Sequence, residues 1–588
     1  MKLSLPENVS SRIDRRDFLK YCAVSGLLAG AAWAVEEKGY KRPNIVMILA
    51  DDLGICDTGA FARRFTGAAI KDMYYETPHL DRLVSQGMAF SQAYACQLCS
   101  PTRASLLTGK NAARVGVTTA TPGSVKSYYN QGISPPAGYL PQDAIFWGDK
   151  IRVEQALLNG STLLALPAGQ PGDRGRDEIT LAEALKDYHS AFIGKWHLGG
   201  HGAEGWQPQD QGFEELSYFD AGGSQYFNWR ALWNRRQKIY PAMPQAQLRM
   251  GKTGKDFGKQ YLTDELTEHA LQFLRDRAAR EKQKPFFLYF CHFSVHTPLQ
   301  ARQKDVAYFQ DKPTRGWNGH DNPTYAAMVR ALDDSVGRIL DTLEQTGLDD
   351  NTLVVFMSDN GGVMYVRQGP TNNAPFKGGK AMLFEGGIRV PLVFRWKGRI
   401  QAGQWCDIPV HSDDLFPTLL ELAGYDVVPY IEQGGIDGRS FKGLLRNPKN
   451  RSQSYARDTF FWHYPFNVIV KHPDDGVPLA PHSAIRQGDY KLIYDWSGRL
   501  LLYNIVQDPF EKHDLSETMP DKTRALFVRL NDWLDAEVDV KYHPALNPNY
   551  RPEKEGRNRP FVDLRSKYLG PKRAIRSPQS DPRLKPKP

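Results

Sequence analysis

The stretch Asn44-Ile45-Val46-Met47-Ile48-Leu49-Ala50, followed directly by Asp51-Asp52, decides the fold of this chain. An unbroken apolar run, in place of an alternating one, is typical of a parallel strand that is covered on both faces. Similar apolar runs occur at residues 191–193, 286–290 and 353–357. The sequence therefore predicts a mostly parallel sheet with helices on both faces.

Helix signals stand before three of these strands. Thr180 and Glu183 form a capping-box pattern, and Thr77-Pro78 places a proline at the first helical position. Residues 325–346 repeat apolar positions at helical spacing. This alternation predicts an α/β fold built on a large mixed, mostly parallel sheet that is sandwiched by helices.

The pattern changes after about residue 446. Residues 483–486, 491–494 and 500–503 have the length and composition of short antiparallel strands, and residues 522–538 those of a closing helix. We predict a catalytic domain over residues 41–446, a smaller α+β subdomain with an antiparallel sheet over 447–545, and an extended, basic, Pro-rich tail over 546–588.

Charge and composition exclude several classes of protein. The 588 residues are 41% hydrophobic and 24% charged, which is close to globular averages and unlike a disordered chain or a coiled coil. Of the net charge of +9, residues 1–34 carry +2 and residues 551–588 carry +8, so residues 35–550 carry −1. A nearly neutral body disfavours a protein that tracks nucleic-acid phosphates.

The N-terminus resembles a twin-arginine export signal. Arg15-Arg16 precede an apolar run from Tyr21 to about Val35, and Ala32-Trp33-Ala34 has the small-x-small pattern of a cleavage site. An uncleaved anchor or a frayed helix is the alternative. We expect residues 1–34 to be a signal peptide and the mature protein to be periplasmic or secreted, off the membrane after cleavage.

Acidic and amide side chains directly follow two of the predicted strands. Asp51-Asp52 follow the first and Asp359-Asn360 the fourth. Ligands of open α/β sheets bind beyond the carboxyl ends of the strands, and such oxygens suit Ca²⁺ or Mg²⁺. Turns and helix caps are the alternative use of each pair taken alone.

The segment from Cys99 to Gly109 contains the pattern Cys99-x-Pro101-x-Arg103. Pro101 is expected to begin a helix, which would place Cys99 at its positive end, a location suited to anionic chemistry. Arg103 would lie about one turn into this helix and face the same point. A buried cysteine without chemistry, or half of a disulfide, is the alternative.

At this point the sequence resembles the type I, formylglycine-dependent sulfatases of the alkaline-phosphatase-like superfamily, over most of residues 43–515. The Cys99 motif matches the family's formylglycine signature, and further matches follow in order along the chain. They are Asn44–Asp52, Thr77–Asp81, Gly194–Gly199, His296–Pro298, Ser358–Gly361, Lys380, Glu385–Pro391, Phe416–Leu420 and Arg486–Leu492.

The resemblance implies that a formylglycine-generating or sulfatase-maturating enzyme oxidises Cys99 to Cα-formylglycine. The aldehyde hydrate would attack sulfur and expel the alcohol, and elimination of sulfate would restore the aldehyde. Asp51, Asp52, Asp359 and Asn360 would bind the metal, Ca²⁺ or alternatively Mg²⁺.

The resemblance also implies roles for five further side chains. Arg103 and Lys195 would stabilise the hydrate, and His197 would act as base in the elimination. His296 and Lys380 would bind sulfate, with His296 preferred as the acid that protonates the leaving alcohol.

Substrate selection is expected in the insertions at residues 120–178 and 224–240, which are rich in aromatic residues, with arginines interleaved in the second; packing of long loops is the alternative. His463 is a weaker candidate for substrate contact. The expected partner is a sulfated small molecule or saccharide, and no nucleic acid. Two other functions stay open: a phosphodiesterase or phosphonate monoester hydrolase of the same superfamily, and a secreted binding protein that holds anionic polymers through its basic tail.

Overall fold

The computed structural model describes most of the chain from residue 41 onward. The described residues are 41–120, 178–198, 208–220, 225–227, 229, 261–280, 284–364, 369–432, 435–449, 455–465, 472–474, 476, 479, 481–546 and 561–575, with the backbone of the short strands β4 (Phe146–Trp147), β5 (Lys150–Ile151) and β6 (Leu163–Leu164). The predicted signal peptide and the end of the tail lie outside the described residues.

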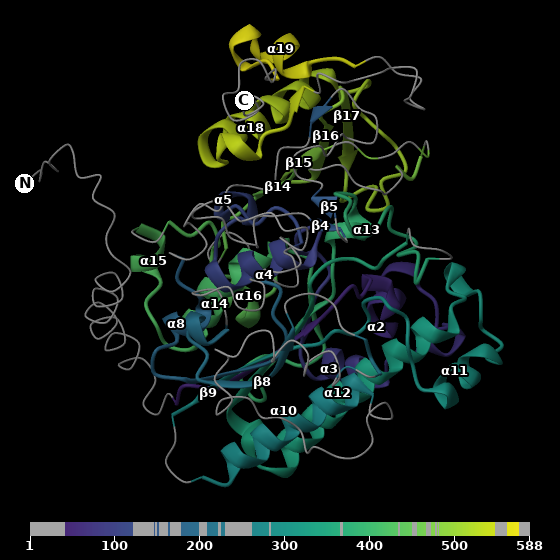
Figure 1. The fold of residues 1–588 in the computed structure, drawn as a ribbon, viewed down its shortest axis with the longest axis vertical. Helices are drawn as coiled ribbons and strands as arrows, with labels where there is room; N and C mark the ends of the chain where they lie inside the picture. Colours follow the sequence, from purple (N-terminus) through teal and green to yellow (C-terminus); the bar gives the residue numbers. More distant parts are fainter. Residues whose placement is uncertain are drawn as a thin grey trace, which may run out of the picture.

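An eight-stranded sheet forms the centre of the larger part of the molecule (Figure 1). Its strands, in spatial order, are β12 (Gln404–Cys406), β2 (Met88–Phe90), β11 (Leu392–Arg395), β10 (Thr352–Ser358), β1 (Asn44–Ala50), β9 (Phe286–Cys291), β7 (His189–Lys195) and β8 (Glu215–Asp220). Within this sheet β11 alone runs against the others, because it pairs antiparallel with both β10 and β2. The predicted mixed, mostly parallel sheet is confirmed.

The apolar stretch 44–50 forms the central strand β1. It pairs in parallel with β10 on one side and with β9 on the other. From Ile45 to Ala50 every residue of β1 is buried, as expected of a strand covered on both faces. The register places Ala50 opposite Ser358, so the residues that follow β1 and β10 emerge side by side.

Helices cover both faces of this sheet (Figure 1). On one side lie α3 (Pro78–Gln86), α10 (Leu262–Ala278) and α12 (Pro323–Gln345), and on the other lie α4 (Cys99–Thr108), α8 (Leu181–Ala184), α14 (Leu415–Leu422) and α16 (Lys442–Arg446). The capping box of Thr180 and Glu183 and the first-turn proline of α3 are both present. Other elements are α2 (Gly59–Thr66), α5 (Ala112–Val115), α11 (Gln303–Gln310), α13 (Glu385–Ile388), α15 (Val428–Glu432), β3 (Ala93–Tyr94), β13 (Val410–His411) and β18 (Ala545–Leu546).

A second, four-stranded antiparallel sheet lies in the C-terminal part of the chain. Its order is β14 (Thr459–Tyr464), β15 (His482–Gln487), β16 (Tyr490–Asp495) and β17 (Arg499–Asn504), and α18 (Pro520–Glu537) packs on it through Phe527 and its neighbours. The three predicted strands and the closing helix are confirmed. Strand β14 was not predicted, because its residues do not alternate between apolar and polar types.

The prediction of an extended tail over residues 546–588 is wrong for residues 561–575. These residues form α19 (Leu564–Leu569) and a short 3-10 turn at Pro571–Arg573, and Leu564 is buried. Arg565 donates to Asn531 and Asp535 of α18, both at 2.6 Å. The basic residues here therefore neutralise acidic side chains of α18, and the helix is too short to show periodicity in sequence.

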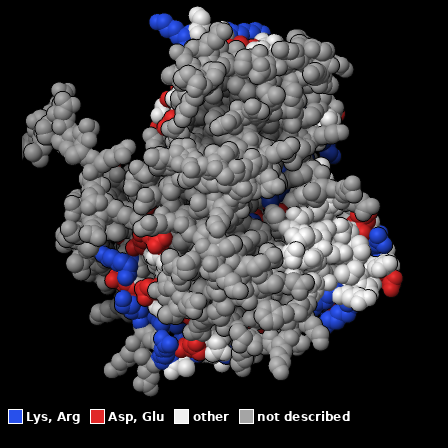
Figure 2. Space-filling view, in the orientation of Figure 1, with Lys and Arg blue, Asp and Glu red and all other residues white. Residues whose placement is uncertain are grey.

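Charged side chains of both signs share the described surface. On the face shown in Figure 2, the described Lys and Arg side chains lie beside Asp and Glu side chains along its rim. This distribution agrees with the charge of −1 over residues 35–550. Among the helices of the described residues, none has the length and apolar character needed to cross a membrane.

Candidate active site

The four predicted metal ligands meet at the carboxyl ends of β1 and β10. The backbone N–H of Asp52 donates to Oδ1 of Asp359 at 3.2 Å, and Nδ2 of Asn360 donates to Oδ1 of Asp52 at 2.8 Å. All four side chains, Asp51 included, are buried. Asp52 has a φ of +64°, a strained backbone conformation for a residue other than glycine, which is typical of functional sites.

Each of the three carboxylates has a cationic partner from a different element. Lys195, the last residue of β7, donates to Asp51 at 2.6 Å. Lys380, in the loop before α13, lies 2.7 Å from Asp52, and Arg103 of α4 lies 2.8 Å from Asp359. Three acidic and three basic side chains therefore pair off in a buried site, where an unpaired charge is costly.

The site has two oxygen atoms suited to a cation. Oδ1 of Asp51 and Oδ1 of Asn360 are buried and have no hydrogen-bond partner among the described residues. Burial and the nearby Asp359 raise the pKa of Asp51 to about 8, because several carboxylates crowd together there. A divalent cation would satisfy both oxygen atoms and relieve the repulsion, so the residues fit Ca²⁺ or Mg²⁺.

Cys99 lies beside this cluster at the N-terminus of α4. Its Sγ and one carboxylate oxygen each of Asp51 and Asp359 lie within 4.8 Å of one another. The helix begins at Cys99, two residues before the predicted start at Pro101. Burial raises the pKa of the Cys99 thiol, although Lys195 and Lys380 oppose this, so an unmodified thiolate is disfavoured here.

Two residues inside the motif connect α4 to the segments that follow β7 and β10. Ser100 donates from its hydroxyl to the carbonyl of His197 at 2.7 Å, and Thr102 donates to the carbonyl of Asp359 at 2.5 Å. Sequence reasoning assigned them nothing, although both stand between the motif's Cys99 and Arg103. Arg103 itself also donates to the carbonyl of Lys195 at 2.6 Å.

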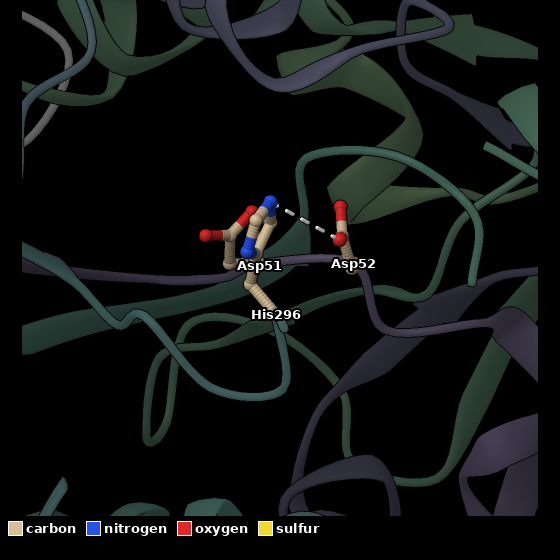
Figure 3. A group of neighbouring side chains, drawn as sticks. All are labelled: Asp51, Asp52 and His296. Atoms are coloured by element: carbon tan, nitrogen blue, oxygen red, sulfur yellow. Dashed lines mark ion pairs between the residues drawn. The ribbon is translucent and has the colours of Figure 1, made fainter. Parts of the chain in front are cut away.

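His296 comes from the loop after β9, and its side chain lies beside those of Asp51 and Asp52 (Figure 3). Its Nε2 lies 3.6 Å from Oδ2 of Asp52, and its Nδ1 lies 2.5 Å from the carbonyl of Thr297. The His296 side chain is 23% exposed, unlike the carboxylates behind it, so it stands on the open side of the site. His197 is buried and has a φ of +58°.

The structure contradicts the prediction that His463 contacts substrate. His463 is buried within the C-terminal part, where Nδ1 meets Ser483 at 2.7 Å and Nε2 meets the carbonyl of Tyr542 at 2.8 Å. Both ring nitrogens are thus used by the protein, and burial lowers the pKa of His463 to about 3. The sequence around His463 could not reveal that this side of β14 packs inward, because its partners lie 20 and 79 residues away in the chain.

The two predicted substrate insertions lie mostly outside the described residues. Of the second, residues 225–227 and 229 are described, and Tyr226 and Trp229 among them are buried. The hydroxyl of Tyr226 donates to the carbonyls of Phe293 at 2.5 Å and His296 at 2.9 Å. Tyr226 therefore packs beneath the His296 loop, and its role is structural.

The site is a buried cluster of three carboxylates, three cationic side chains and a cysteine at the strand ends of a mixed α/β sheet, which suits an enzyme that acts on an anionic ester. The family model described as Sulfatase matches residues 43–425, and the model described as N-sulphoglucosamine sulphohydrolase, C-terminal, matches residues 378–536. The chain belongs to the sulfatase family and is a sulfuric ester hydrolase.

Individual relatives agree with this assignment. The chain is 30% identical to a sulfatase of Formosa agariphila over 87% of its own length and 91% of that protein. It is 32% identical to the N-acetylgalactosamine-6-sulfatase of Rattus norvegicus, over 70% and 69% of the two chains. Among solved structures, that of Ps i-CgsB in complex with k-i-k-neocarrahexaose has a TM-score of 0.62 and 26% identity, and the match covers 87% and 97% of the two chains.

Proposed function

We propose that this sulfatase removes sulfate from a sulfated saccharide, with Cys99 oxidised to formylglycine and Ca²⁺ bound by Asp51, Asp52, Asp359 and Asn360. The observation that carries the proposal is the position of Cys99 within the charged cluster, beside two carboxylates. The saccharide class is supported by the relative named for N-acetylgalactosamine 6-sulfate and by the neighbour bound to a neocarrahexaose.

The reaction would need two groups beyond the unmodified side chains, namely the formylglycine made from Cys99 and a bound cation. The formylglycine hydrate would supply a hydroxyl nucleophile, and the cation would balance negative charge on the sulfate oxygens. Arg103 and Lys195 hold positive charge beside the nucleophile position. Lys380, which pairs with Asp52, would present its ammonium group to a sulfate oxygen. His197, whose backbone carbonyl accepts from Ser100 next to Cys99, is the proposed base for the elimination step.

His296 is the proposed acid for the leaving alcohol. It lies on the open side of the site, where the alcohol portion of the substrate must extend, and its Nε2 points inward (Figure 3). The carbonyl of Thr297 accepts from Nδ1–H and so orients the ring. Nε2 would therefore carry the proton for the departing oxygen only in the imidazolium form; burial and the nearby Lys380 lower the pKa of His296 to about 3, and a bound anionic sulfate would oppose that lowering.

His296→Gln tests this assignment through the leaving group. A poor alkyl leaving group needs a proton and a good nitrophenyl group does not, so turnover of a sugar sulfate should fall by about 10²–10⁴-fold. Turnover of nitrophenyl sulfate should fall far less. Steady-state kinetics with both substrates measures the difference, and an equal loss on the two would assign the acid to another residue.

Comparing kcat/KM for sulfate and phosphate esters distinguishes the sulfatase from the phosphodiesterase alternative. We expect one preparation to hydrolyse nitrophenyl sulfate with a kcat/KM well above that for bis-nitrophenyl phosphate and for a phenylphosphonate ester. A panel of sulfated mono- and oligosaccharides, read by released inorganic sulfate, then identifies the sugar. Better turnover of the phosphorus esters would replace the sulfatase proposal with the phosphodiesterase one.

Maturation and export are part of the same proposal. We propose that a formylglycine-generating or sulfatase-maturating enzyme acts on the Cys99 segment, and that Arg15-Arg16 direct twin-arginine export to the periplasm or the medium. Cell fractionation of an Arg15→Lys, Arg16→Lys variant tests the second part. Unchanged export of that variant would contradict it.

A further inference from the structure

The short helix α13 is built into the floor of the active site. Gly361, which follows the proposed metal ligand Asn360, donates from its backbone N–H to the carbonyl of Gly387 at 2.9 Å. A Cβ atom at Gly361 would lie 1.8 Å from the carbonyl oxygen of Gly386, so only glycine permits this approach. The position of α13 relative to the end of β10 is therefore tightly defined.

The same helix contacts the segment that carries Lys380. The N–H of Gly386 donates to the carbonyl of Lys377 at 2.8 Å. A Cβ atom at Gly387 would lie 2.4 Å from the carbonyl oxygen of Gly379, the residue before Lys380. A displacement of α13 would therefore move the backbone that presents the Lys380 ammonium group to Asp52 and to sulfate.

The C-terminal sheet holds the first residue of α13 through a buried ionic network. Lys491 of β16 lies 2.7 Å from Oε1 of Glu385 and 2.8 Å from Oε1 of Glu511. Glu511 in turn accepts from the backbone N–H of Glu385 at 2.7 Å, and Tyr94 donates to Oε2 of Glu385 at 2.8 Å. All four side chains are fully buried. The network thus clamps both the side chain and the backbone of Glu385.

Burial makes this network sensitive to the loss of any member. Removing one partner of a buried ion pair leaves an uncompensated charge in the interior. The intact network, by contrast, adds little to the free energy of unfolding and mainly fixes the positions of its side chains. Glu511 has a φ of +55° and Ala381, next to Lys380, a φ of +67°, so both ends of the connection are strained conformations held in place by their surroundings. Such a construction is expected where a precise side-chain position matters.

We propose that Glu385 and Lys491 are positioning residues for catalysis, because their ion pair fixes α13 and through it the Lys380 segment. The four-stranded C-terminal sheet thereby helps to position the proposed sulfate-binding site. None of its described side chains is among the proposed metal ligands. This inference rests on the proposed role of Lys380 in binding sulfate.

A double-mutant cycle of Glu385→Gln and Lys380→Ala tests the proposal on the full-length enzyme. Glu385→Gln keeps the shape of the side chain but removes one of the two carboxylate charges that face Lys491, the other being that of Glu511. A misplacement of about 1 Å costs up to about 10²-fold in rate, so we expect kcat/KM to fall by about 10-fold to 10²-fold in the wild-type background. In the Lys380→Ala background the same change should cost less than about 3-fold, since coupled residues are not additive.

Asp349→Asn is the matched control. Asp349 and Arg395 form a buried ion pair with two hydrogen bonds, of which the one from Nη2 of Arg395 to Oδ2 of Asp349 measures 2.9 Å. This pair lies at the opposite end of β10 from the active site. Its loss should lower the melting temperature as Glu385→Gln does, but its effect on kcat/KM should be small and equal in both backgrounds.

Each outcome of the cycle has one reading. Non-additive losses for Glu385→Gln support the proposal, and fully additive losses, or none, overturn it. If Lys380→Ala leaves kcat/KM unchanged, the proposed function of Lys380 fails, and this inference with it. Should Glu385→Gln not fold, Glu511→Gln weakens the same network from the other side and is expected to give the same non-additivity.

Discussion

Cys99→Ala is expected to abolish sulfate ester hydrolysis. The substitution removes the atom from which the proposed nucleophile is made, and loss of a nucleophile lowers turnover by at least about 10³-fold. Stability should change little, because the buried Cys99 side chain is small. Kinetics and thermal unfolding of the variant, measured on the same preparation, separate the two effects.

Cys406→Ala is the matched control for this experiment. Cys406 is equally buried but lies on the edge strand β12, where its thiol faces the carbonyl of Pro448 at 3.6 Å. It should keep full activity. Mass spectrometry of the peptide that contains Cys99 should show the lower mass of the aldehyde in active wild-type protein. An active Cys99→Ala enzyme would refute the nucleophile assignment.

Removal of Ca²⁺ should abolish turnover and lower the melting temperature, and added Ca²⁺ should restore both. A ligand that binds only the folded state at 100 times its Kd adds about 2.7 kcal/mol to the free energy of unfolding. The orphan oxygen atoms of Asp51 and Asn360 are the structural reason to expect this stabilisation. Differential scanning fluorimetry with chelator and then with Ca²⁺ gives the shift without reference to activity.

Two variants show whether the cation binds where we propose. Asn360→Ala removes one of the orphan oxygen atoms without breaking an ion pair, so the Ca²⁺-dependent rise in melting temperature should shrink. Asp349→Asn breaks an ion pair away from the site and should lower the melting temperature while the Ca²⁺-dependent rise stays the same. An undiminished rise in Asn360→Ala would place the cation elsewhere.

The charge balance of the site explains how a nearly neutral body can attract a sulfate ester. Asp51, Asp52 and Asp359 are neutralised by Lys195, Lys380 and Arg103 within the protein itself. A bound divalent cation would leave the site with a local excess of positive charge. Attraction for the substrate then comes from this buried cluster, and the basic ends of the chain are not needed for it.

Parts of the fold and site were predictable because they depend on local pattern. The apolar strand before Asp51 and the one before Asp359 could be read as parallel neighbours, and parallel neighbours bring their carboxyl ends together. The motif around Cys99 was predictable by resemblance alone, since spacing does not show that a cysteine is oxidised. The contacts of Ser100 and Thr102 with His197 and Asp359 could not be read in the same way, because their partners are distant in sequence.

The sequence by itself determined the mixed α/β sheet, the sulfatase family and the residues at the strand ends, because strand periodicity and short motifs are properties of neighbouring residues. Only the tertiary structure decided which lysine or arginine pairs with which carboxylate and that His463 packs inward. It also decided that Lys491 of the C-terminal sheet reaches Glu385 at the floor of the active site. These features depend on side chains that lie far apart in the sequence. They become neighbours only when the central sheet and the C-terminal sheet pack together.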